Sequence, residues 1–430
     1  MNQNIGLLVA VFAVLALLRV PVGISMLASG IAYLMWSGQD VGLLVDQVGG
    51  RLFASYTLIA IPMFIFAANI MNGAKITDRI VSVAAYALGW LPGGIAHANV
   101  ASSVVFSGMS GSAVADIAGP GRVMTKMMTD SGQYSSGYAC AVTAASATIG
   151  PIIPPSIPVV LYALVSNASV GALFLGGIVP GLIMALAMIG LIAFQAWRRG
   201  FGREEGLKLS GLRTAIIEAV LPMLMPVILL SGIYFGITTA TEAASLAALY
   251  AMVLAGLVYR TLGLRELIDA LVSTVRESAI VGVMLAGAFI VSFAITNERF
   301  PNALAETLLA MKLSPFAFLI AVNILFLLLG CFLDVSVMLL VLVPLLIPTV
   351  ILSGIDLVHF GIVIIINIMI GLITPPYGLM LFVMSSLTET KLKAIVVEIV
   401  PFVAVLIGVL ALLIVFPQLV LWLPHQLGFR

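Results

Sequence analysis

The segment GPIIPPSIP at residues 150–158 decides how this chain folds, because it places four prolines inside an apolar run at about residues 138–165. Each proline removes a backbone donor from a helix. A helix in lipid tolerates this loss only where protein or a polar cavity replaces the hydrogen bonds. A second copy, GLITPP at residues 371–376, interrupts the apolar run at about residues 362–385. Two helices broken at corresponding places indicate the binding site of a secondary transporter.

The composition places the chain in a membrane. Hydrophobic residues make up 62% of its 430 residues and charged residues only 9%, whereas a soluble domain carries about 25% charged residues. We therefore predict an all-α polytopic membrane protein surrounded by a lipid bilayer. The 19 Lys and Arg nearly balance the 18 Asp and Glu, so no nucleic-acid partner is expected. The sequence shows no catalytic constellation and no phosphate-binding glycine loop, and we expect that the protein is not an enzyme.

Two further segments are too polar or too irregular for a straight span. Residues 93–121 hold a cluster of serines and glycines near their middle, and Asp116 follows this cluster. Residues 315–352 hold the sequence GCFLD near their middle, and two prolines follow. Irregular backbone at membrane depth must be buried in protein or line a cavity. We therefore predict two re-entrant helical hairpins, at about residues 93–121 and 315–352, whose tips face the broken helices.

The halves of the chain, residues 1–213 and 214–430, repeat one order of segments: a helix pair, an arm, a hairpin and a broken helix. The broken motifs begin at residues 150 and 371, an offset of 221, and Gly108 and Gly330 of the hairpins are 222 residues apart. The second arm is expected as a charged amphipathic segment followed by a separate span. Each half is predicted to hold about five transmembrane helices plus its hairpin. An odd number of spans inverts the second copy, so we predict two inverted-topology repeats.

The basic residues also indicate opposite orientations of the two halves. The loop at residues 198–213 carries five basic residues, Lys208 among them, and the positive-inside rule makes it cytoplasmic. The loop that links the first hairpin to its broken helix carries Arg122 and Lys126, whereas its counterpart at residues 353–359 carries no Lys or Arg. Counting spans from the basic loop places these two linking segments on opposite sides of the membrane.

The candidate site residues lie at the hairpin tips and at the breaks in the helices. Backbone carbonyls and hydroxyls suit Na⁺, and helix N-termini suit a carboxylate. The first Na⁺ site is assigned to Ser107, Ser110, Gly150, Ile153 and Pro155, and the second to Gly330, Asp334, Gly371 and Thr374. The residues expected to contact a carboxylate substrate are Ser110, Asp116 and Ser156. Close helix packing is the alternative explanation for each serine and glycine, but it does not explain the neighbouring prolines.

Acidic residues at membrane depth are costly and are functional candidates by default. Glu242 also has a structural explanation, because it opens a predicted helix whose dipole favours an acid. Asp334 follows its hairpin tip and is placed to cap the return arm in the same way. Asp116 follows the first tip, where it either shapes the substrate cavity or pairs with a cation.

These segments resemble the large membrane subunit of tripartite ATP-independent periplasmic (TRAP) transporters. The matching segments are VPVG at residues 20–23, IPMF at 61–64, the first tip at 107–116, the first break at 150–156, TEAA at 241–244 and the second break at 371–376. The resemblance implies an elevator-type transporter of the bacterial inner membrane that imports organic acids with Na⁺. Typical substrates are C4-dicarboxylates, sialic acid and other sugar acids.

The resemblance also implies partner proteins, and the sequence leaves alternative functions open. Members work with a small four-helix membrane subunit and with a periplasmic substrate-binding protein that delivers the carboxylate. This chain shows no four-helix extension, so the small subunit is expected as a separate polypeptide. The alternatives are a stand-alone Na⁺/carboxylate symporter or Na⁺/H⁺ antiporter of similar architecture, and a channel.

Overall fold

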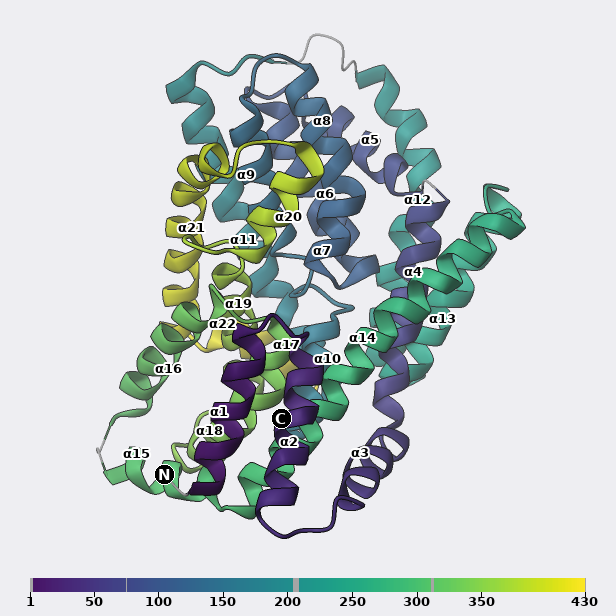
Figure 1. Cartoon of the computed structure of the whole chain (residues 1–430). Coiled ribbons are helices and arrows are strands. Elements are labelled where there is room, and N and C mark those ends of the chain that lie inside the picture. Colours follow the sequence, from purple (N-terminus) through teal and green to yellow (C-terminus); the bar gives the residue numbers. More distant parts are fainter. Residues whose placement is uncertain (1–2, 75, 204–208, 311–312, 430) are drawn as a thin grey trace.

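The computed structural model describes residues 3–74, 76–203, 209–310 and 313–429, and these residues form helices and no strand (Figure 1). Within these ranges, seven helical segments are long and apolar enough to cross a membrane, and six apolar helices of 10–17 residues accompany them. The predicted all-α polytopic membrane class is therefore confirmed. Lys208 of the basic loop lies outside the described residues.

The helices of the first half of the chain come first. They are α1 (Gln3–Leu17), α2 (Val22–Trp36), α3 (Leu43–Ala54), η1 (Tyr56–Ile59), α4 (Ala60–Gly73), α5 (Ile76–Leu88), α6 (Gly94–Ser110), α7 (Ala113–Asp116), η2 (Ile117–Gly121), α8 (Arg122–Asp130), α9 (Ser136–Ala147), α10 (Ile157–Ser166) and α11 (Val170–Arg199).

The helices of the second half of the chain follow. They are α12 (Leu209–Tyr234), α13 (Ala240–Val253), η3 (Leu254–Val258), α14 (Leu264–Asn297), α15 (Phe300–Ala310), α16 (Pro315–Gly330), α17 (Val335–Val337), η4 (Met338–Leu342), α18 (Val343–Leu352), α19 (Leu357–Gly371), α20 (Leu379–Thr388), α21 (Leu392–Val415) and α22 (Gln418–Gln426). The second arm is one continuous helix, α14, where the sequence pattern predicted an amphipathic segment and a separate span.

The first hairpin extends beyond the predicted residues 93–121. Its first arm is α6, its tip lies at Gly111 and Ser112, and its return arm runs through α7 and η2 into α8. Arg122 and Lys126 are exposed residues on α8, so the prediction that they lie in a loop was wrong. The return arm stays helical because α8 packs against both α6 and α9.

The two halves are interlocked. α4, the arm of the first half, packs against α13, and α14, the arm of the second half, packs against α2. The broken helices cross over in the same way, because α9 packs against α20 and α10 packs against α19 (Figure 1). The first arm of each broken helix thus contacts the second arm of the other, so the two broken helices run antiparallel.

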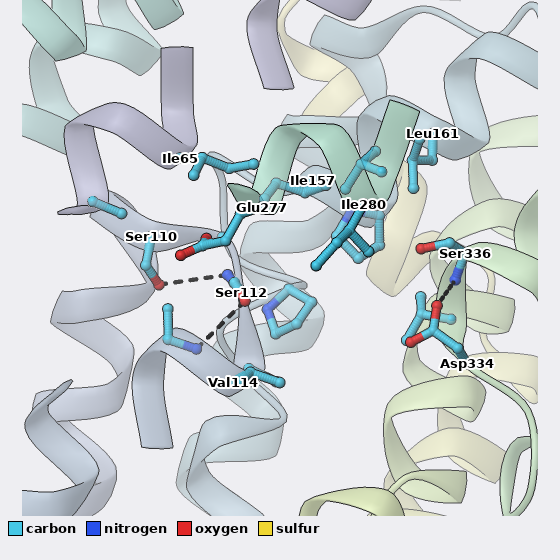
Figure 2. A pocket seen from close by; sticks show the side chains of 18 of the residues that line it. Ile65, Ser110, Ser112, Val114, Ile157, Leu161, Glu277, Ile280, Asp334 and Ser336 are labelled. Carbon is cyan, nitrogen blue, oxygen red and sulfur yellow. Dashed lines mark hydrogen bonds between the residues drawn. The ribbon is translucent and has the colours of Figure 1, made fainter. Parts of the chain in front are cut away.

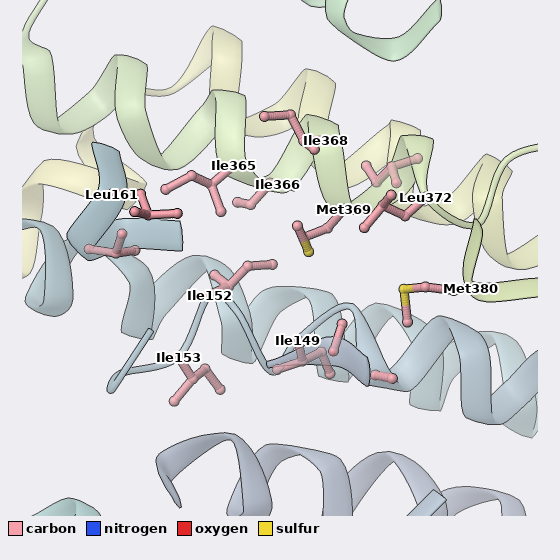
Figure 3. Packing of buried hydrophobic residues seen from close by; sticks show 14 of the residues in the cluster. Ile149, Ile152, Ile153, Leu161, Ile365, Ile366, Ile368, Met369, Leu372 and Met380 are labelled. Carbon is pink, nitrogen blue, oxygen red and sulfur yellow. The ribbon is translucent and has the colours of Figure 1, made fainter. Parts of the chain in front are cut away.

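Isoleucine and methionine side chains from both broken helices form one buried cluster (Figure 3). Ile149 and Ile152 come from the first break, Ile365 and Met369 come from α19, and Met380 comes from α20. Each of these side chains is at most 1% exposed. Lipid tails are as apolar as these side chains, so close van der Waals packing holds the cluster together. The cluster fixes the two breaks beside one another at the centre of the molecule.

Candidate ion and substrate site

The tip of the first hairpin lies directly on the first break. Gly111 ends α6 with φ at +59°, and its carbonyl accepts a hydrogen bond from the Ile157 amide at 3.4 Å. A Cβ atom at Gly111 would lie 2.4 Å from the Pro155 carbonyl oxygen, which is too close for any side chain. Glycine also adopts this left-handed conformation without steric cost. The tip therefore requires glycine for two independent reasons.

Two serines cap the helices that start at this junction. The Ser112 hydroxyl accepts a hydrogen bond from the Ala115 amide and caps α7. The Ser156 hydroxyl accepts from the Val159 amide, caps α10, and donates to the Pro151 carbonyl. Ser156 is fully buried. Its hydroxyl, predicted to contact substrate, serves here as a helix cap.

The first break leaves backbone oxygens without backbone donors. Among the described residues, no backbone amide donates to the carbonyl oxygens of Gly150, Ile153 or Pro155. All three residues are buried, and buried carbonyls in native proteins are normally paired. The Ser107 hydroxyl lies on the arm above the tip, where it is buried and donates to the Val104 carbonyl at 2.6 Å. Carbonyl and hydroxyl oxygens are the ligands that a hard cation prefers.

The backbone of the second tip contacts the backbone of the second break at Gly330 and Gly371. A Cβ atom at Gly371 would lie 2.8 Å from the Gly330 carbonyl carbon, so the two glycines allow the chains to touch. The Asp334 carboxylate accepts from the Ser336 amide at 2.8 Å and caps α17. Thr374, three residues after the end of α19, donates to the Ile370 carbonyl at 2.6 Å. The predicted capping role of Asp334 is confirmed, and Glu242 likewise forms a capping box at the start of α13.

A cavity of about 430 Å³ lies where both hairpin tips and both broken helices meet α4 and α14 (Figure 2). Ser110 and Asp334 are the predicted site residues that line this cavity. Its polar lining residues are Asn69, Asn72, Ser110, Ser112, Glu277, Asp334 and Ser336. The other assigned Na⁺ residues lie outside the cavity lining, and most of them are buried.

Asp116 lies on α7, behind the cavity wall. Its side chain is fully buried, and neither carboxylate oxygen accepts a hydrogen bond from a described residue. The neighbouring Ser103 interacts with this carboxylate but donates its hydrogen bond to the Ser146 hydroxyl at 3.0 Å. Asp116 is not among the residues that line the cavity, and its carboxyl group lies within the core of the first hairpin.

The chain matches the family described as the DctM component of tripartite ATP-independent periplasmic transporters over residues 9–419. The chain belongs to this family. It is 39% identical to the sialic acid TRAP transporter large permease protein SiaM of Vibrio cholerae, over 94% of this chain and 95% of the relative. It is 35% identical to the C4-dicarboxylate TRAP transporter large permease protein DctM of the same species, over 95% and 94%. A DctM-family chain with seven candidate spans is a multi-pass protein of the bacterial inner membrane.

A solved structure shares the fold of this DctM-family chain. The YdaH transporter of Alcanivorax borkumensis superposes with a TM-score of 0.61 over 87% of both chains, at 16% sequence identity. Similarity at this level of identity shows the fold alone. The recognised family and the transporter fold agree with the secondary transporter predicted from the two broken helices.

Sequence reasoning missed the polar bridges that join each hairpin to its broken helix in this DctM-family chain. Asn99 donates to Thr143 at 2.7 Å in the first half, and Asn367 donates to the Asn323 side chain at 2.7 Å in the second. All four residues are buried, and both pairs are 44 residues apart. This shared spacing is the signal that could have identified them. The bridges hold each tip in place over its break.

Glu277 was also missed. It lies on α14 directly after the predicted amphipathic segment at residues 260–276, lines the cavity and interacts with Asn69 of α4. Asn69 in turn donates to Thr274, one turn earlier on α14, at 3.2 Å. Figure 2 shows Glu277 beside Ser110 of the first tip. The arm helices therefore contribute polar groups to the site as well as support.

Proposed function

We propose that this chain is the large permease of a Na⁺-coupled importer of an organic acid. The observation that carries the proposal is the single cavity at which both hairpin tips and both broken helices meet. Helices broken at mid-membrane supply free carbonyls for Na⁺ and helix N-termini for anions. The relatives named for sialic acid and C4-dicarboxylates support an organic acid as the transported molecule.

The first Na⁺ site is proposed at Ser107, Ser110, Gly150, Ile153 and Pro155. Three buried carbonyls without a backbone amide donor among the described residues, at Gly150, Ile153 and Pro155, support this assignment. The second site is proposed at Gly330, Asp334, Gly371 and Thr374, by correspondence between the halves. The touching backbones of the second tip and the second break support its position. Both cations would neutralise part of the negative charge near the cavity.

The two halves are proposed to be inverted repeats of an elevator-type transporter, each with about five membrane helices and one hairpin. This proposal is supported by the antiparallel contact of the broken helices and by the packing of each arm against a helix of the other half. The hairpins and broken helices would form the moving unit, because the buried cluster joins the two breaks. The helix pairs α1–α2 and α12–α13 with the arms would form the static frame.

A periplasmic substrate-binding protein is proposed to deliver the acid, and a small four-helix membrane subunit is proposed to complete the complex. The tripartite description of the family supports both partners. The test is uptake of labelled organic acids into proteoliposomes that contain this chain, with and without a Na⁺ gradient and the two partners. Uptake that requires both Na⁺ and the binding protein is expected. Full-rate uptake without the binding protein would instead indicate a stand-alone symporter, and flux that ignores the Na⁺ gradient would indicate a channel.

A further inference from the structure

The cavity carries two acidic side chains and no basic one. Glu277 of α14 forms one wall beside Ser110, and Asp334 of the second tip lies on the opposite wall (Figure 2). None of the described residues that line the cavity is a lysine, arginine or histidine. Arg276 precedes Glu277 on α14 but does not line the cavity. A site for an anion thus has walls that repel additional negative charge.

Neither acid is neutralised by a cationic side chain in the described structure. The ion pairs among the described residues are Arg79–Glu218 and Arg199–Glu398, and neither pair lies in the cavity. An ionised carboxylate has about four acceptor positions. Asp334 uses one for the Ser336 amide, and Glu277 interacts with one side-chain amide. Both acids therefore retain the capacity to accept hydrogen bonds from a bound molecule.

The donors in the cavity are few. The side-chain donors that remain for a bound molecule are the hydroxyls of Ser110, Ser112 and Ser336 and the amide of Asn72, because the Asn69 amide already donates to Thr274 and interacts with Glu277. The Ser110 and Ser112 hydroxyls each accept from a backbone amide, which leaves their own hydrogens to donate. Asn72 accepts the Thr77 hydroxyl through its oxygen, which leaves its NH₂ group as a donor. These groups suffice for one carboxylate, and no basic side chain among the described lining residues compensates a second.

We propose that Glu277 determines specificity by excluding a second carboxylate from the substrate, whereas the charge of Asp334 is compensated by the cation of the proposed second Na⁺ site. The acid that fits is a monocarboxylate whose remaining groups donate hydrogen bonds, as the hydroxyls of a sugar acid do. Specificity of this kind comes from repulsion of the wrong ligand as much as from attraction of the right one. This inference rests on the proposed function and adds the substrate class to it.

The test compares acids of equal chain length on the purified chain in nanodiscs with Na⁺ present. The six-carbon series is gluconate, glucarate and hexanoate, and the four-carbon series is threonate, tartrate and butyrate. Within each series the first acid is a hydroxylated monocarboxylate, the second adds a carboxylate and the third lacks hydroxyls. We expect the hydroxylated monocarboxylate to bind at least about tenfold more tightly than the other two in at least one series.

The variant Glu277→Gln keeps the size of the side chain and removes its charge. We expect it to reduce the preference for the monocarboxylate over the matching dicarboxylate by about tenfold, a factor in the range of one removed like charge. Glu266→Gln, at an exposed position near the start of α14 and outside the cavity, is the matched control and should change nothing.

The outcomes separate the inference from the proposed function. Na⁺-dependent binding in which the dicarboxylate or the acid without hydroxyls equals the hydroxylated monocarboxylate would overturn the inference and leave the function standing. An unchanged preference in Glu277→Gln would also overturn it. Absence of Na⁺-dependent binding for every acid would overturn the proposed function, and the inference with it.

Discussion

Substituting Gly111 with alanine should displace the first hairpin tip from its break and weaken Na⁺ binding. A Cβ atom here would lie 2.4 Å from the Pro155 carbonyl oxygen, whereas carbon–oxygen contacts settle at about 3.3 Å. The backbone must therefore separate by about 0.9 Å, which exceeds the tolerance of about 0.5 Å for a binding site. Alanine at φ +59° also costs about 1–2 kcal/mol.

Gly132 provides the control for this substitution. It has φ at +71° and nothing within 4 Å of the added Cβ, so Gly132→Ala carries the left-handed cost without the clash. Gly111→Ala should lower the free energy of unfolding by about 1–3 kcal/mol more than Gly132→Ala does. This difference isolates the contact between the tip and the break. The assay is thermal unfolding in detergent across a Na⁺ titration, with choline holding ionic strength constant.

The Na⁺ concentration at half-maximal stabilisation should rise at least about tenfold in Gly111→Ala. It should stay unchanged in Gly132→Ala, which lies away from the tip. If both variants keep the same Na⁺ dependence as the unmodified chain, the contact of tip and break does not build the cation site. The assignment of a Na⁺ site to the carbonyls of Gly150, Ile153 and Pro155 would then be refuted.

Further substitutions test other parts of the site. Ser110→Ala should reduce the Na⁺ dependence of uptake more than Ser82→Ala on α5, and equal effects would contradict the tip assignment. Gly371→Ala puts a Cβ 2.8 Å from the second tip, so it should lower Na⁺ affinity and unfolding temperature. Gly408→Ala, with nothing within 4 Å, should leave both unchanged, and equal results for the two would argue against the backbone contact. Asn367→Leu should lower the free energy of unfolding by about 1–3 kcal/mol, because it leaves the buried side-chain oxygen of Asn323 on α16 without its donor. An unchanged temperature of thermal unfolding would remove the polar bridge from the account.

The sequence predicted the breaks well because several prolines in an apolar run have few structural solutions in lipid. The second hairpin matched its expected residues 315–352, whereas the first extended to Asp130, because an amphipathic return arm has the same polarity as a loop. The prediction that the second arm consists of two separate segments was wrong. The residues change from charged to apolar near Glu277, which moves the helix into a different environment but does not interrupt it. α14 holds no proline to interrupt it.

The composition of the site could be predicted only in part. Residues at the tips and breaks were identified because glycine, serine and proline are unusual at membrane depth. Whether a given serine faces the cavity or caps a helix depends on rotation about its own element, which periodicity does not specify. Ser110 therefore lines the cavity and Ser156 caps α10, although both had the same sequence signature. Glu277 reaches the site only through the packing of α14 against α4.

The central claim is that the two tips and two breaks form one organic-acid site that depends on Na⁺. Its most direct test is equilibrium binding of a labelled acid to the purified chain in nanodiscs as Na⁺ replaces choline. The acid is the one that binds most tightly among the six-carbon and four-carbon series. The account predicts that the apparent Kd falls at least about tenfold in Na⁺, a coupling within the usual range for linked sites. The same Kd in Na⁺ and in choline would contradict it.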